Sequence, residues 1–338
     1  MSSNGSALNR PYVSVDYAQL SDDQKTALKI LQDWRDDANN QDLADDPHGY
    51  IRKFLTDVTL HRYLVARNWQ TDSALAQLRR TVVWRRKTFG HIEPDPAFPD
   101  APKMECEQCL SDPASHCFFP VGWDDVGRPI LYGCQKRMAY PDVEASLVHV
   151  FYNIEKSLRS TRSSGQFIYF VDFNGFDFQE ALKARYAIRF LMTFADHYPE
   201  RLGRMVLVNP PSVFQMFYNA AKVFADQRTM NKVLFLYTPS NAKSQPDAST
   251  FGDPNVDGLM TQLRDLGMGN RDPSFLSWFA AALRMEAKPG NLPNVYGWAE
   301  WGKKVAEYPT EEQPHWVARD KELHEIQVSK TPWTCMKF

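Results

Sequence analysis

The sequence predicts an α/β protein in which a helical N-terminal part is followed by a mixed, partly parallel sheet flanked by helices. Three observations support this fold class. The first ninety residues contain three segments with helical spacing of apolar residues. From residue 117 onward, short β-prone runs alternate with amphipathic helical segments, the order that builds parallel strands. One run, QFIYFVDF, is apolar almost throughout, as in a strand covered on both faces.

The N-terminal part is expected to form three helices. Ser21 and Gln24 make a capping-box pattern in front of a helix over about 22–37. The segment TLHRYLVARNW predicts a second helix. The third, TDSALAQLRRTVVWRRKTFG, is expected to begin at a Thr71 cap or one residue later and to end near Gly90.

The second part is expected to begin with two strands joined by a polar turn, within CFFPVGWDDVGRPILYGC. Because proline cannot donate to a ladder, Pro129 predicts that the second strand starts at a sheet edge. Next come an amphipathic helix in PDVEASLVHVFYNIEKSLRS, the strand QFIYFVDF and a helix over about 179–195. The strand MVLVN, the helix SVFQMFYNAAKVFA and the strand KVLFLY complete the alternation.

The composition indicates a soluble globular protein, with 43% hydrophobic and 24% charged residues. A net charge of −2 gives no basic field for a nucleic-acid partner. The longest apolar runs are shorter than the roughly 20 residues that span a bilayer, and the N-terminus lacks the profile of a secretory signal. With five cysteines thinly spread, we expect a reducing, cytoplasmic location.

One cysteine cluster is a candidate metal site. CEQCLSDPASHC places Cys106, Cys109, His116 and Cys117 close together, and all four are zinc-type ligands. The adjacent pair His116 and Cys117 has the wrong spacing for one ion, so ordinary loop cysteines are the favoured interpretation. We therefore predict no metal.

Enzyme motifs are not found. The sequence contains no nucleophile elbow, no phosphate-binding loop, no His-Glu-x-x-His and no dinucleotide fingerprint after a strand. His197 lies beside carboxylates, but no nucleophile accompanies it. We expect no catalytic residue and no cofactor.

The segment 196–236 carries a family resemblance. DHYPERLGRMVLVNPPSVFQMFYNAAKVFADQRTMNKVLFL resembles the signature region of the CRAL-TRIO lipid-binding family, as in the fungal secretory phosphatidylinositol transfer proteins. Similar stretches in the same order are LHRYLVARNWQTDSALAQLRRTVVWRR, DDVGRPIL and FVDFNGF, so that the likeness covers about residues 46–236.

The resemblance implies a domain plan. An N-terminal extension and helix occupy 1–45, the helical lobe 46–95, the lipid-binding domain 96–288, and a Trp- and Pro-rich tail 289–338. In the lipid-binding domain the sheet would enclose an apolar lipid pocket that a gating helix closes. The hydrophobic pocket and gate are assigned to Phe167, Tyr169, Val213, Phe214, Phe217 and Phe224.

The resemblance also implies a phosphatidylinositol headgroup site. Its residues correspond here to Arg67, Glu200, Thr229 and Lys232. Arg67 and Lys232 would offset the phosphodiester charge, and the other two would exchange hydrogen bonds with inositol hydroxyls. A surface pairing of Glu200 with Arg201 or Arg204 is the structural alternative. Asn68 departs from the pattern, because many members have lysine there.

The second ligand is expected to differ from phosphatidylcholine. Members that bind this lipid carry Ser and Thr on the strand before Val-Asp and Tyr on the neighbouring strands; here those positions are Phe167, Tyr169, Pro120 and Leu131. A bulkier, less polar pocket favours a sterol or another isoprenoid. Haem is disfavoured, since its His-Asp-Tyr motif is replaced by Val171-Asp172-Phe173.

The expected function is lipid exchange or presentation at a cytoplasmic membrane surface, without catalysis. On RRTVVWRRK, the basic residues Arg79, Arg80, Arg86 and Lys87 form either a dock for anionic lipid or a solvated helix face. The alternative function is a ligand-sensing regulatory module. Its protein partner would bind the tail, whose Trp298, Trp301, Trp316 and Trp333 otherwise dock on the body.

Overall fold

The computed structural model describes residues 15–96, 98–104, 118–124, 128–134, 143–159, 165–173, 184–211, 232–236 and 261–268. They divide between two compact units, each considered by itself. A helical unit comprises residues 12–104 and 184–201, and a sheet unit comprises 105–183 and the chain from 202 onward together with residues 1–11. The predicted gating helix, the cysteine cluster and the Trp-rich tail lie outside the described residues.

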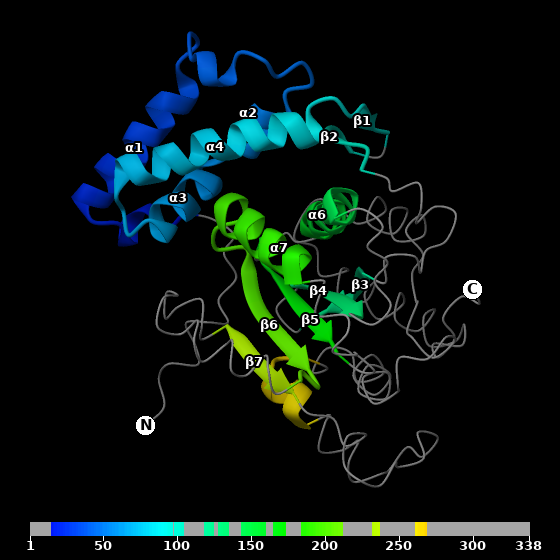
Figure 1. Ribbon diagram of the computed structural model, residues 1–338. Helices are drawn as coiled ribbons and strands as arrows, with labels where there is room; N and C mark the ends of the chain where they lie inside the picture. The colour runs from blue at the N-terminus through cyan, green and yellow to red at the C-terminus, as the bar shows by residue number, and fades with distance from the viewer. Residues whose placement is uncertain are drawn as a thin grey trace, which may run out of the picture. The chain divides into compact units, whose positions relative to one another are not determined.

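The helical unit contains five α-helices among the described residues (Figure 1). They are α1 (Asp22–Asp36), α2 (Tyr50–Phe54), α3 (Asp57–Ala66), α4 (Thr71–Phe89) and α7 (Ala184–His197). Two 3-10 turns, η1 (Tyr17–Gln19) and η2 (Gln41–Leu43), flank α1. Strands β1 (Pro94–Asp95) and β2 (Phe98–Pro102) pair as an antiparallel ribbon.

Two helix starts test the capping predictions. At α1 the capping box is confirmed: Ser21 Oγ accepts the Gln24 N–H at 3.2 Å, and the Gln24 side chain accepts the Ser21 N–H at 3.0 Å. At α4 the predicted cap is wrong by one residue or more, because Thr71 is already helical and Gln70 is the extended residue in front of it. Gln70 makes no side-chain cap bond.

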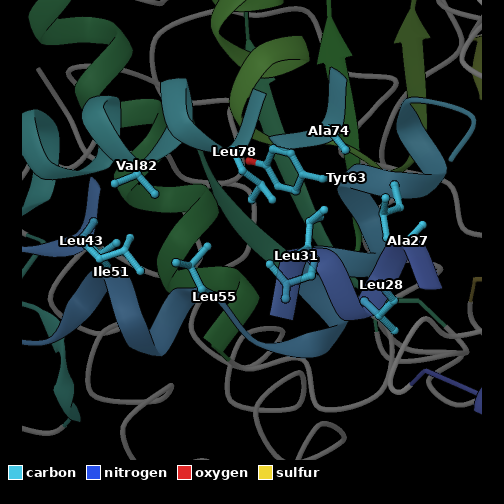
Figure 2. Packing of buried hydrophobic residues seen from close by; sticks show 12 residues of the cluster. Ala27, Leu28, Leu31, Leu43, Ile51, Leu55, Tyr63, Ala74, Leu78 and Val82 are labelled. Carbon is cyan, nitrogen blue, oxygen red and sulfur yellow. The ribbon is translucent and has the colours of Figure 1, made fainter. Parts of the chain in front are cut away.

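The helices of this unit share one apolar core, shown in Figure 2. Leu31 from α1, Leu64 from α3 and Leu78 from α4 each have an exposed fraction of 0%. Along each of these helices the core residues recur every three or four positions, as the sequence pattern predicts. The core holds α3 in place, and α3 ends at the candidate site residue Arg67.

The sheet unit contains a mixed five-stranded sheet in the order β3-β4-β5-β6-β7. The strands are β3 (Phe118–Trp123), β4 (Pro129–Cys134), β5 (Phe167–Asp172), β6 (Leu202–Val208) and β7 (Val233–Leu236). β3 and β4 are antiparallel, and the other neighbouring pairs are parallel. Helix α6 (Val143–Arg159) contacts β3, β4 and β5. The predicted α/β class with a partly parallel sheet is confirmed.

The strand assignments hold with one correction. All six residues of β5 are buried, as its apolar run predicts. The expectation that Pro129 marks an edge strand is wrong, because β4 lies between β3 and β5. Pro129 is the first residue of β4, and the ladder to β5 starts one residue later, at Ile130 with Ile168. A proline in the first position removes no hydrogen bond from that ladder.

Candidate functional site

Arg67 lies where α3 ends. It is the C-cap residue, and the next two residues, Asn68 and Trp69, have left-handed backbone angles, with φ of 50° and 64°. The Trp69 N–H donates to the Leu64 carbonyl at 2.7 Å, which closes the turn. Asparagine adopts this conformation more readily than most residues. The departure at Asn68 therefore suits the turn that presents Arg67.

The Arg67 guanidinium is held by one side chain of α4. Its Nε donates to Gln77 Oε1 at 2.7 Å, and Gln77 is buried with an exposed fraction of 1%. Within the described part of the chain, the terminal nitrogens of Arg67 make no further hydrogen bond. These nitrogens form the planar fork with which arginine binds phosphate.

Gln77 also bonds to the C-terminus of α7. Its Nε2 donates to the carbonyls of Ala195 and Asp196 at 3.1 and 2.9 Å. The last carbonyls of a helix have no partner within the helix, and Pro199 has no N–H to offer to Ala195. One turn further along α4, Thr81 Oγ1 donates to the Asp196 carbonyl at 3.2 Å. Side chains of α4 therefore cap α7.

An aromatic stack supports the same chain end. The His197 ring lies parallel to Trp84, with centroids 4.4 Å apart, and Tyr198 packs edge-on to Trp84 at 5.8 Å. Thr81 Oγ1 lies 3.0 Å from His197 Nδ1. Burial lowers the pKa of His197 to about 4, with a smaller lowering from Arg85 and an opposing effect of Asp196. At neutral pH His197 is therefore uncharged, and its ring packs against Trp84.

Glu200 follows this stack directly. It is half-buried and has a φ of 57°, unusual for a residue that is neither glycine nor asparagine. The Arg201 N–H donates to the Tyr198 carbonyl at 3.2 Å, so that Glu200 lies in a tight turn between α7 and β6. The charge of Glu200 acts on buried Arg62: burial lowers the pKa of Arg62, Arg201 lowers it further, and Glu200 raises it.

The remaining headgroup candidates belong to the sheet unit. Lys232 directly precedes β7 and has an exposed fraction of 7%. Its carbonyl accepts the Met205 N–H at 2.8 Å, which fixes its backbone to β6. Thr229 lies outside the described residues, as do the gate candidates Val213, Phe214, Phe217 and Phe224. Arg67 and Glu200 are thus brought into one unit, and Lys232 is in the other.

The strand positions predicted to exclude choline lie in register. Pro120 pairs with Leu131 and Leu131 pairs with Tyr169, so that the three form one row across β3, β4 and β5. The Tyr169 ring packs edge-on to Phe118, with centroids 5.3 Å apart. Tyr169 and Phe167 are both buried. The row offers one side-chain hydroxyl, that of Tyr169.

A buried polar stripe on α6 was missed in the sequence. Ser146, His149, Asn153 and Ser157 recur at helical spacing, and each has an exposed fraction of 2% or less. His149 Nε2 and Asn153 Nδ2 each lie 3.3 Å from the Phe118 carbonyl. The spacing of these residues was the available signal, because it matches that of the apolar face beside it.

Residues 114–245 match the CRAL/TRIO domain family. These residues correspond to a CRAL/TRIO domain. The family resemblance predicted from the sequence is thereby confirmed.

Two curated relatives show what this chain is similar to. The chain is 28% identical over 222 residues to the phosphatidylinositol transfer protein PDR17 of Saccharomyces cerevisiae, covering 63% of this chain and 61% of that protein. It is 23% identical over 255 residues to Protein real-time of Aedes aegypti, covering 70% of this chain and 36% of that protein. The chain thus spans less than two thirds of the length of either relative.

A solved structure supports the fold of this chain. The crystal structure of Sfh5 matches with a TM-score of 0.50 at 14% sequence identity, covering 75% of this chain and 99% of that one. At this identity the likeness concerns the fold alone. No helix in the described ranges is long and apolar enough to cross a membrane.

The basic stretch of α4 is largely engaged within the helical unit. Arg79 Nε lies 2.8 Å from Asp42 Oδ2, and Arg80 Nη2 lies 3.3 Å from Asp196 Oδ1. Arg86 donates to the carbonyls of Asp42 and Asp45 at 2.6 and 2.7 Å. Their charges are partly offset by these acidic residues and carbonyls, which weakens the case for a lipid dock on this helix.

Among the described residues no cluster of metal-ligating side chains is found, and the Cys106 cluster lies outside them.

Proposed function

We propose that this CRAL/TRIO protein binds phosphatidylinositol and transfers it between, or presents it at, cytoplasmic membrane surfaces. The observation that carries the proposal is the placement of Arg67, whose Nε is held by Gln77 while its terminal nitrogens have no other partner in the described part of the chain. Support also comes from the likeness to PDR17, whose name describes such a carrier. Catalysis has no part in the proposal.

The apolar wall and the headgroup contacts have different roles in this proposal. At ~0.8 kcal/mol per methylene, two acyl chains with about thirty methylenes lose on the order of 20 kcal/mol when exposed to water. The protein must offset this unfavourable free energy by covering the acyl chains with its own apolar surface. Charged hydrogen bonds contribute about 1.5–3 kcal/mol each and therefore select the headgroup.

The headgroup roles follow the charges and the hydrogen-bonding groups of the four residues. Arg67 and Lys232 are assigned to the phosphodiester, because both are cations and the arginine fork matches two phosphate oxygens. Glu200 and Thr229 are assigned to inositol hydroxyls, as hydrogen-bond acceptor and donor. Lys232 lies directly before β7 with an exposed fraction of 7%, so its charge is held close to the sheet.

For the exchanged lipid we propose a sterol or another isoprenoid. The row of Pro120, Leu131 and Tyr169 contains no Ser or Thr side chain for a choline phosphate. A rigid, nearly apolar molecule with one hydroxyl needs a single polar partner, and Tyr169 is our candidate for that role.

Native mass spectrometry of protein purified from a eukaryotic host tests the proposal. Wild-type protein is expected to carry phosphatidylinositol, and Lys232→Ala to lose it while keeping any second lipid. Lys29→Ala is the matched control, because Lys29 is exposed on α1 and pairs with Asp33 at 2.6 Å. Wild-type protein without phosphatidylinositol would contradict the proposal, and loss of both lipids from Lys232→Ala would indicate a folding defect.

A further inference from the structure

We infer that Gln77 is a positioning residue for lipid headgroup recognition, through its simultaneous hydrogen bonds to Arg67 and to the C-terminus of α7. This inference rests on the proposed function and names a residue outside the four assigned to the headgroup. The two ends of the buried Gln77 amide make different contacts. Oε1 accepts from Arg67, and Nε2 donates to two carbonyls of α7.

The acceptor end orients Arg67. Arginine side chains have many rotamers, and ordering one at the moment of binding costs affinity. A hydrogen bond at Nε removes much of this freedom and leaves the N–H groups of the two terminal nitrogens for other acceptors. Gln77 is itself held in place: it is buried on α4 with an exposed fraction of 1%, and its Nε2 is bonded to the end of α7. The fork of Arg67 is therefore preorganised for an anion.

The donor end fixes the chain that leads to Glu200. The helix cannot satisfy the Ala195 carbonyl, since residue 199 is proline, and Gln77 Nε2 lies 3.1 Å from that carbonyl. Glu200 is four residues beyond Asp196, in a turn with a left-handed φ of 57°. The Gln77 amide therefore links the orientation of Arg67 to the chain segment that carries Glu200.

Gln77 is suited to this role because a primary amide is both acceptor and donor. Glutamate would still accept from Arg67 but would place a carboxylate oxygen against two carbonyl oxygens. Methionine has a similar volume and provides neither strong hydrogen bond. Gln77→Met therefore removes the link with little change in packing.

The test is a double-mutant cycle on uptake of phosphatidylinositol from vesicles of phosphatidylinositol and phosphatidylcholine. Gln77→Met is expected to weaken uptake about tenfold, the effect of losing one charge-assisted hydrogen bond. In the Arg67→Ala background the same change is expected to have a smaller effect, because only the link to the segment that carries Glu200 remains to be lost. An equal loss in both backgrounds would overturn the inference.

A second measurement does not depend on the ligand. The Arg67 Nε–H signal in ¹⁵N NMR reports the order of the guanidinium, and Gln77→Met is expected to lower its order parameter. Gln32→Met is the matched control: Gln32 lies on α1 and its side chain donates to the Tyr17 hydroxyl at 3.2 Å, so the Arg67 signal should not change.

The two readouts separate the failure of the inference from that of the proposed function. If wild-type protein takes up no phosphatidylinositol, the proposed function fails, and the Arg67 signal then tests only whether Gln77 orders the guanidinium. An unchanged order parameter in Gln77→Met overturns the inference, and a lower one supports the ordering of Arg67 by Gln77. If the lipid binds and Gln77→Met frees Arg67 without weakening uptake, the positioning role is overturned.

Discussion

Arg128 and Asp124 form a buried ion pair at the turn between β3 and β4. Arg128 Nε lies 2.6 Å from Asp124 Oδ2, and Asp124 Oδ1 accepts the Arg128 N–H at 2.7 Å. The exposed fractions of the two side chains are 2% and 0%. A carboxylate and a guanidinium this deeply buried are stable only together, so the pair locks the start of β4 in place.

Arg128→Met is expected to destabilise the protein by about 3–5 kcal/mol, because it leaves the Asp124 carboxylate buried without its charge partner. Urea unfolding measures the change. The double variant Asp124→Asn with Arg128→Met should be more stable than Arg128→Met alone, since neither charge of the pair remains. A loss below about 1 kcal/mol in Arg128→Met would show that the pair is dispensable.

Gly203→Ala tests the packing of β6 against the same arginine. A Cβ at this position would lie 3.0 Å from Arg128 Nη1 and 3.2 Å from the Phe167 carbonyl. We expect a loss of about 1–3 kcal/mol from overpacking, measured by thermal unfolding. In the Arg128→Met background the cost should shrink, because the nearest atom is no longer there. An equal cost in both backgrounds would assign the clash to the backbone of β5.

His197 predicts a pH dependence of stability. Burial lowers its folded-state pKa to about 4, below the ordinary value of 6.5. Between these two values the unfolded chain binds a proton that the folded chain does not. The stabilisation is thus complete above pH 6.5 and is lost as the pH falls towards 4.

The check is to compare wild-type protein with His197→Phe, which keeps a ring against Trp84 and cannot titrate. Urea midpoints measured from pH 7.5 down to pH 4 should fall more steeply for wild-type protein. Parallel pH profiles for the two proteins would show that His197 does not contribute to acid sensitivity.

Ser21→Ala is expected to destabilise the helical unit by about 1 kcal/mol, since it removes the cap of α1. Phosphatidylinositol uptake should be unchanged at a temperature well below unfolding. Ser73→Ala, at an exposed position in the first turn of α4, is the matched control and should have little effect. Calorimetry distinguishes the two variants, and equal melting temperatures would refute the capping role.

The sequence predicts elements whose residues carry a local signal. Ser21 and Gln24 specify the start of α1 by themselves, and the apolar run of β5 reports its burial directly. The prediction that Pro129 starts a strand at the sheet edge was wrong, because a proline removes a hydrogen-bond donor at one residue only. The position of β4 in the sheet depends on its pairing with β5 as well as with β3, and the pairing with β5 is a distant one that a local pattern does not report. Local patterns therefore gave the elements and not the order of β4.

The candidate site shows the same division. Arg67, Glu200 and Lys232 were assigned through a family motif, whereas Gln77 has no motif in its favour. Its role depends on carbonyls 118 and 119 residues away along the chain. Only the folded arrangement brings such groups together. The polar stripe of α6 was visible as a spacing, but that spacing does not tell which face is buried.

The helical unit is built from two stretches of chain that residues 105–183 separate. During synthesis, α4 leaves the ribosome about a hundred residues before α7. The core of α1, α3 and α4 has the contacts to form early, whereas Tyr63, Gln77 and Thr81 must wait for the carbonyls of α7. The order of translation thus makes the linkage of Arg67 to the Glu200 turn a late event, completed only after most of the sheet's strands have been made.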